Sequence, residues 1–285
     1  MRYSAMRAAW MAIAVALSLG WAPWARADDV PYVQSATRVV DVMLSMAKVG
    51  PQDFVVDLGS GDGRIVIAAA KRHGARGVGI ELDRRLVEQS RATASREGVA
   101  DRVTFLHEDI FVADFSKATV VTMYLLPSVN YQLRPRLLYE LRPGTRVVSH
   151  DFDMADWEPD AQTTIPVPDK PVGARKESTI YLWIVPARLA GHWRGTLAGP
   201  QGEEPVLIEF EQVFQKVRAM VWLRRATMGG SGRIQGGTLS LGLKRSDVQS
   251  SPILDFRLAV ADGRLEGEAL EGDRRYTLRA SRLAN

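Results

Sequence analysis

The hydrophobic residues of this chain change their spacing near residue 186, and that change divides the chain into two kinds of structure. Between residues 53 and 150, five short apolar runs alternate with segments whose apolar residues recur at helical spacing. Strands that alternate with helices at short intervals are typical of a parallel sheet with helices on both faces. From about residue 189 onward, apolar and polar residues alternate one by one, which is typical of antiparallel strands with one buried face. The sequence therefore predicts an α/β domain followed by an all-β domain.

The predicted elements of the first part are short and closely spaced. Helices are predicted near 39–46, 65–70, 84–96 and 129–141, and strands at 53–58, 77–81, 103–106, 119–124 and 146–150. Two further strands, 163–167 and 179–185, have no helix between them. A parallel pair would need a long crossover connection, so we expect these two strands to pair antiparallel at the edge of the sheet.

In the second part, apolar residues occupy every other position in three separate stretches. These are 206–210, 239–243 and 254–260, and turns typical of hairpins follow at 261–263 and 271–273. The pattern predicts an antiparallel barrel or sandwich, with Trp193 and Trp222 in its core or at the bottom of the barrel. We place the boundary between the domains near residues 186–191, which gives a first domain of 28–187 and a second of 188–285.

The N-terminus has the organisation of a secretory signal peptide over residues 1–27. Arg2 and Arg7 come before an apolar run at 8–17, and the segment ends in Ala25-Arg26-Ala27. We expect the signal to be cleaved and the mature protein to be exported to the periplasm; an uncleaved anchor and a misassigned start codon are the alternatives. Nothing later in the chain has the pattern of a membrane span, so none is expected in the mature chain.

Charge and cysteine content exclude several classes of function. The formal net charge is +4, but removal of residues 1–27 takes away three arginines and leaves 34 basic against 33 acidic residues, or +1. A nearly neutral chain has no broad basic surface for DNA or RNA, so a nucleic-acid partner is not expected, with a local basic patch as the alternative. There are no cysteines, which excludes disulfides and zinc–thiolate sites, and no metal site is predicted.

A glycine-rich turn at residues 57–63, Asp-Leu-Gly-Ser-Gly-Asp-Gly, connects the first predicted strand to the next helix. Ligands of α/β sheets bind at such turns. A dinucleotide-binding turn would have glycine at its sixth position, where this chain has Arg64, and the Gly-Lys-Ser/Thr ending of a phosphate-binding loop is missing.

The charges of the turn indicate which ligand it binds. Asp57 and Asp62 would repel a pyrophosphate but attract a ligand with positive charge. S-adenosylmethionine (SAM) carries both an ammonium and a sulfonium group, and glycines let the backbone approach it closely. The sequence therefore predicts SAM as the methyl donor, held here by Asp57, Gly59, Ser60, Gly61, Asp62 and Gly63.

Acidic residues also follow the next two predicted strands. Glu81 ends the second strand, where a carboxylate can accept hydrogen bonds from both ribose hydroxyls. Asp109 follows the third strand and is predicted to meet the adenine amino group, although such residues often cap turns. Leu82 and Ile110 are predicted to pack against the adenine ring.

Over about residues 31–185, the sequence resembles the class I SAM-dependent methyltransferases, whose sheet is Rossmann-like. More narrowly, 31–33, 57–70 and Asp151-Phe152 with Trp157 and Pro159 resemble the small lysine methyltransferases related to those that modify the c subunit of ATP synthase and the adenine nucleotide translocase. The resemblance implies protein lysine methylation, with Tyr32 helping to enclose SAM.

The substrate side of the site is predicted from residues after the fourth and fifth strands. Tyr124 can orient an amine through its hydroxyl or its ring, and His150 can act as a base, although both are also common structural residues. No Asn/Asp-Pro-Pro-Tyr/Phe motif follows the fourth strand, which argues against DNA adenine methylation. The expected acceptor is a protein lysine, with a small molecule or lipid, or a binding role without catalysis, as alternatives.

Overall fold

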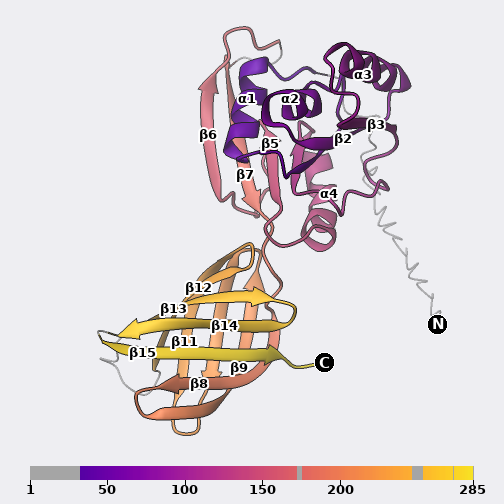
Figure 1. The fold of residues 1–285 in the computed structure, drawn as a ribbon. Coiled ribbons are helices and arrows are strands. Elements are labelled where there is room, and N and C mark those ends of the chain that lie inside the picture. Colours follow the sequence, from indigo (N-terminus) through magenta and orange to yellow (C-terminus); the bar gives the residue numbers. More distant parts are fainter. Residues whose placement is uncertain (1–32, 172–174, 246–252, 272, 285) are drawn as a thin grey trace, which may run out of the picture.

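A computed structural model describes residues 33–171, 175–245, 253–271 and 273–284 (Figure 1). The predicted signal peptide at 1–27 and the predicted lid residue Tyr32 lie outside these ranges. None of the helices within the described ranges is long and apolar enough to cross a membrane.

The first part of the chain is a sheet of seven strands in the order β3-β2-β1-β4-β5-β7-β6. The first five strands run parallel to one another, while β7 pairs antiparallel with both β5 and β6. The antiparallel pair predicted at the edge is therefore present. The elements are α1 (Thr37–Met46), β1 (Phe54–Leu58), α2 (Arg64–His73), β2 (Arg76–Glu81), α3 (Arg84–Arg96), β3 (Val103–His107), β4 (Val120–Met123), α4 (Pro127–Glu140), β5 (Arg146–His150), β6 (Ala161–Pro166) and β7 (Glu177–Ile184).

Both faces of this sheet are covered by helices, which explains why its strands are apolar at successive positions. Val55 and its neighbours on one face pack against α1 and α2, whereas Val56 and its neighbours on the other face pack against α4. The Rossmann-like arrangement predicted from the sequence is confirmed. The carboxyl ends of β1, β2 and β4 meet at one edge of the sheet, where ligands of such folds bind.

The second part of the chain is a closed barrel of eight antiparallel strands, which decides between the two predicted all-β folds (Figure 1). Along β10 the buried positions are Val217, Ala219 and Val221, so Trp222 points outward and is 38% exposed. The prediction of a core position is wrong for Trp222 but correct for the fully buried Trp193. The strands are β8 (Gly191–Gly199), β9 (Gly202–Val213), β10 (Lys216–Trp222), β11 (Thr227–Gln235), β12 (Thr238–Arg245), β13 (Leu254–Ala261), β14 (Arg264–Glu271) and β15 (Arg274–Arg282).

The barrel is attached to the sheet domain through the turn between β9 and β10. Phe214 in this turn stacks on Trp157 of the sheet domain, with ring centroids 6.0 Å apart. Gln215 donates a hydrogen bond to the Glu158 carbonyl, and Arg233 forms an ion pair with Asp160 at 2.7 Å. These contacts all involve the loop that connects β5 to β6.

Candidate functional site

The turn between β1 and α2 is built from glycines in the left-handed backbone conformation. Gly59, Gly61 and Gly63 have φ angles of 73°, 54° and 78°. A Cβ atom on Gly63 would lie 2.6 Å from the Phe105 ring, and one on Gly59 would lie 2.8 Å from Leu125. The turn therefore needs glycine both for its backbone shape and for space.

We expect Gly63→Ala to destabilise the protein by about 3 kcal/mol, because it adds a steric clash to backbone strain. A matched control is Gly98→Ala, since Gly98 has a φ of 70° but a Cβ atom there would meet nothing within 4 Å. That variant should lose only about 1 kcal/mol from strain. Chemical denaturation of both variants measures the difference, and equal losses would show that the clash with Phe105 is absent.

Asp57 lies at the end of β1 and is almost completely buried, with 2% exposure. Its carboxylate accepts a hydrogen bond of 2.6 Å from Thr122 on β4. The pKa of Asp57 is raised to about 7, mainly by burial and also by the nearby carboxylates of Glu81 and Asp62, while the hydrogen bond from Thr122 acts in the opposite direction. A buried carboxyl group next to a ligand cavity is suited to stabilising a positively charged ligand.

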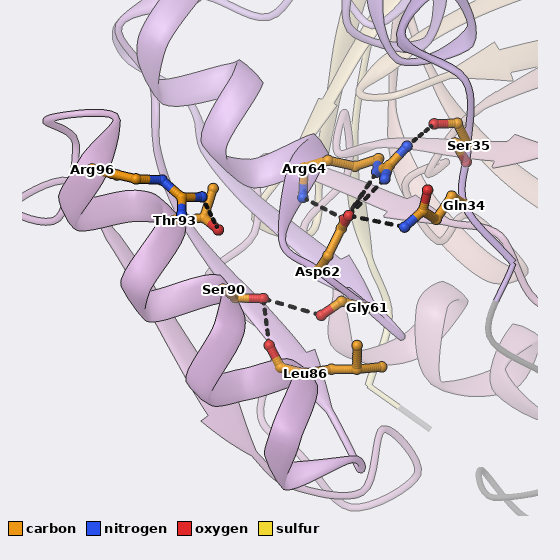
Figure 2. A network of polar contacts seen from close by, with 9 residues as sticks. All are labelled: Gln34, Ser35, Gly61, Asp62, Arg64, Leu86, Ser90, Thr93 and Arg96. Carbon is orange, nitrogen blue, oxygen red and sulfur yellow. Dashed lines mark hydrogen bonds and ion pairs between the residues drawn. The ribbon is translucent and has the colours of Figure 1, made fainter.

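Asp62 is neutralised by a neighbour, a contact that was not predicted from the sequence. Arg64 forms an ion pair with the Asp62 carboxylate at 2.6 Å and donates a hydrogen bond to the Ser35 carbonyl at 2.7 Å. Figure 2 shows Arg64 between these two groups, with Gln34 also directed at Asp62. The pair connects the glycine turn to the segment before α1, and it leaves Asp57 and Glu81 as the carboxylates that attract a cation.

Glu81 ends β2 and fixes the glycine turn from the opposite side. Its two carboxylate oxygens accept hydrogen bonds of 2.8–2.9 Å from the backbone N–H groups of Gly61, Leu82 and Asp83. A carboxylate has about four acceptor positions, so one remains available for a ligand hydroxyl group. Ser90 on α3 supports the same turn, with its Oγ 3.0 Å from the Gly61 carbonyl (Figure 2).

These groups surround one cavity. Most of the predicted cofactor residues line it, and the lining residues are Val33, Gln34, Ser35, Asp57, Gly59, Ser60, Gly61, Asp62, Arg64, Ile65, Glu81, Leu82, Ile110, Tyr124 and Leu125. Asp109 is not among them, and its carboxylate accepts a hydrogen bond from the Phe111 N–H. The structure thus places Asp109 as a turn cap, the alternative role considered for it.

A glycine cradle and two carboxylates together fit a SAM molecule. The glycines let the backbone approach the ligand closely, and the Asp57 and Glu81 carboxylates suit its positive charge and its ribose. Ser60 also lines the cavity, but its Oγ is buried and lies beside Gly79, 2.6 Å from where a Cβ atom of that residue would be. This hydroxyl group is therefore not directed at the ligand.

Tyr124 follows β4 and connects the cavity to a second group of polar residues. Its ring lies on the His150 ring, with centroids 3.9 Å apart, and its hydroxyl donates to the Asp151 carboxylate at 3.5 Å. Burial and the charge of Asp151 raise the pKa of Tyr124 to about 12, so the hydroxyl stays protonated. The structure therefore brings both predicted substrate-side residues together.

His150 does not have the surroundings of a general base. It is 3% exposed, and its ring nitrogens each lie 2.9 Å from a hydroxyl group, Ser35 Oγ at Nδ1 and Ser178 Oγ at Nε2. Burial lowers the pKa of His150 to about 4, so the ring is neutral near pH 7. These contacts favour the structural role that was the alternative for His150, in which it supports the Tyr124 ring and anchors the segment before α1.

Comparison with known proteins agrees with this geometry. The family model of the ANTKMT methyltransferase domain matches residues 57–161, from the glycine turn to the start of β6. A protein-lysine N-methyltransferase of Saccharolobus islandicus is 43% identical over 157 residues, covering 55% of this chain and 94% of that protein. The chain belongs to this methyltransferase family. It is a SAM-dependent methyltransferase, and SAM is its methyl donor.

Two other relatives bear on the acceptor. The adenine nucleotide translocase lysine N-methyltransferase of Mus musculus is 39% identical, with 46% of this chain and 57% of that protein covered. A crystal structure named as an RNA methyltransferase from Salinibacter ruber, in complex with S-adenosyl-L-homocysteine, is 52% identical. It covers 55% of this chain and 96% of that one, with a TM-score of 0.50. The family model ends at residue 161, well before the barrel begins at Gly191.

Proposed function

We propose that this enzyme transfers the methyl group of SAM to the side-chain amine of a protein lysine. The names of the Saccharolobus and mouse relatives support this acceptor. The observation that carries the proposal is the carboxylate of Asp151, which lies beside Tyr124 at the substrate end of the cavity and binds a lysine ammonium, that of Lys170, at 2.6 Å. The site is thus already suited to a lysine side chain.

In the proposed mechanism, the residues of the chain mainly bind and orient the reactants. When bound, SAM supplies a methyl group activated by its sulfonium. Glu81 accepts a hydrogen bond from a ribose hydroxyl group, and Asp57 stabilises positive charge. Because the Tyr124 hydroxyl is protonated, its oxygen lone pair can accept an N–H of the acceptor amine and direct the nitrogen toward the methyl group. The ammonium loses its proton to solvent before attack.

An RNA acceptor is the second candidate, favoured by the name of the Salinibacter structure. The balance of 34 basic and 33 acidic residues beyond residue 27 gives an RNA acceptor little electrostatic support. A small molecule or a lipid is the third candidate for the methyl acceptor.

A labelling experiment separates these acceptors. The full chain is incubated with radiolabelled SAM and either envelope protein, total RNA or extracted lipid from its source cell. We expect label in protein, recovered as methyl-lysine after acid hydrolysis, and about 100-fold less label with Asp57→Asn at a SAM concentration well below Kd. Label confined to RNA or to the lipid extract would overturn the proposal in favour of the corresponding acceptor.

We also propose that the enzyme is exported to the periplasm. The basic start, the apolar run at 8–17 and the Ala25-Arg26-Ala27 ending support export. Mass spectrometry of the protein purified from its source cell should find Asp28 as the first residue. Intact residues 1–27 would contradict cleavage.

A further inference from the structure

The substrate end of the site contains a fixed carboxylate, that of Asp151. This residue has a left-handed backbone with a φ of 63°, which is uncommon for a residue other than glycine. Its N–H donates to the Thr179 carbonyl at 2.7 Å, and its Oδ1 accepts from the Thr179 N–H at 3.1 Å. These contacts with β7 leave Oδ2 directed at Tyr124 and His150, at 3.5 Å and 3.4 Å.

The cation bound to this carboxylate belongs to the chain itself. Lys170 Nζ lies 2.6 Å from Asp151 Oδ2 and donates a hydrogen bond of 2.6 Å to the Glu177 carbonyl. The Lys170 side chain is only 14% exposed. A largely buried ammonium is costly unless it is paired, so the two acceptors together hold the amine in place.

The connection between β6 and β7 carries Lys170 to this position. Val167 N–H bonds to the Lys176 carbonyl, and Lys170 N–H bonds to the Val167 carbonyl, at 2.8 Å and 3.0 Å. Lys176 Nζ in turn donates to the Lys170 carbonyl at 2.7 Å. The backbone on both sides of Lys170 is therefore anchored, and its side chain points toward the methyl-transfer site.

Tyr124 relates this amine to the cofactor. Lys170 Nζ and Tyr124 Oη approach the same carboxylate oxygen, so they can be no farther apart than the two distances together. Tyr124 also lines the cofactor cavity. Only the Tyr124 side chain therefore separates the Lys170 amine from the cavity that receives the methyl donor.

We propose that Lys170 is methylated by the active site of its own chain. This inference rests on the proposed function, because it assigns lysine as the acceptor. The Nζ ammonium first loses one proton to solvent. The nitrogen lone pair then forms a bond to the methyl carbon of SAM, the sulfur–carbon bond breaks with its electron pair on sulfur, and S-adenosyl-L-homocysteine leaves.

The two acceptors around Lys170 set the degree of methylation. An unmodified ammonium has three N–H groups, of which two are used by Asp151 and the Glu177 carbonyl. A monomethylated ammonium keeps its charge and two N–H groups, enough for both acceptors. A second methyl would leave one acceptor without a donor, so the reaction stops at one methyl group.

The test uses the purified full chain with SAM, followed by peptide mass spectrometry. One methyl group on Lys170 is expected. It should be absent with Lys170→Arg and present with Lys71→Arg, since Lys71 is an exposed residue of α2 that pairs with Glu97. Its rate per molecule should not change with protein concentration, because the acceptor and the site are in one chain. Thermal melting of Lys170→Arg shows whether this variant folds, and the site of modification is identified on the unsubstituted chain in either case.

Three outcomes would overturn the inference. In the first, envelope proteins gain methyl-lysine while Lys170 stays unmodified, which leaves the proposed function intact. In the second, Lys170 is methylated at a rate per molecule that rises with protein concentration, which makes it a substrate of another copy. In the third, no lysine of any protein is methylated, which overturns the proposed function as well.

Discussion

Replacing Asp57 with Asn is expected to weaken SAM binding about 100-fold and, at the same time, to stabilise the ligand-free protein above pH 7. Both effects have one cause, the burial of a carboxylate that is 2% exposed. The ionised form costs free energy in the empty cavity but attracts the positive charges of SAM. Asparagine is nearly the same size and keeps an oxygen for the hydrogen bond from Thr122, so packing should change little.

The pH dependence of unfolding follows from the pKa of Asp57, which burial raises from 3.8 to about 7. Between these two values the folded protein binds more protons than the unfolded chain, so stability falls as pH rises through this window. The contribution of Asp57 protonation to the free energy of unfolding is complete below about pH 4 and lost above about pH 7. This contribution is on the order of 4 kcal/mol at most, and Asp57→Asn should remove it from the pH dependence of unfolding.

SAM binding should show the opposite trend with pH. A cationic ligand favours the ionised carboxylate, so affinity rises as pH approaches about 7 from below, and binding at pH 6 releases a proton from Asp57. Calorimetric titration in buffers of different ionisation enthalpy measures that proton. A comparison of the unsubstituted chain with Asp57→Asn removes the contribution of SAM's own amino group.

Asp53 provides the matched control, because it lies at the other end of β1. Burial alone would raise the pKa of Asp53, but the hydrogen bonds from Thr119, Arg146 and the Gly50 N–H together outweigh it and hold the pKa below its usual value. Asp53→Asn should therefore lower stability near neutral pH and leave SAM affinity unchanged. Equal losses of SAM affinity in the two variants would show that Asp57 has no direct effect on the ligand.

The fold could be predicted in some detail because hydrophobic spacing depends on local geometry. Parallel strands covered on both faces are apolar at successive positions, as at Val55 and Val56, whereas barrel strands alternate, as at Val217, Ala219 and Val221. The closure of the barrel could not be predicted, because β8 pairs with β15 at the far end of the sequence. Alternation fixes which side chains face inward, not which strands become neighbours.

The candidate site was predicted less completely, because partners far apart in sequence decide what each charge does. The ion pair of Asp62 with Arg64 is the exception, because the two residues are only two positions apart and their spacing could have suggested the contact, although it was not predicted. The roles of His150 depend on Ser35 and Ser178, which come from other elements and carry no motif. Lys170 reaches Asp151 only because the β6–β7 connection folds back, and nothing in its sequence neighbourhood indicates this.

Glu81→Gln is expected to raise the KM for SAM roughly 100-fold, since about 3 kcal/mol of hydrogen bonding to charged groups is lost. The carboxylate accepts hydrogen bonds from three backbone N–H groups, that of Gly61 in the glycine turn and those of Leu82 and Asp83 after β2, and one ribose hydroxyl group is expected to add to these. An amide replaces one acceptor oxygen by an NH₂ group, which cannot accept from these donors. Glu81→Gln therefore weakens both the hydrogen bonds that hold the glycine turn and the hydrogen bond to the ribose.

The kinetic pattern distinguishes this role from a catalytic one. Contacts to the ribose are the same before and during transfer, so kcat at saturating SAM should fall much less than kcat/KM. Glu88→Gln is the control, because Glu88 is an exposed residue of α3 that pairs with Arg84, and it should leave both constants unchanged. A KM for SAM that stays the same in Glu81→Gln, with kcat reduced, would contradict ribose binding by Glu81 and assign it to the transfer step instead.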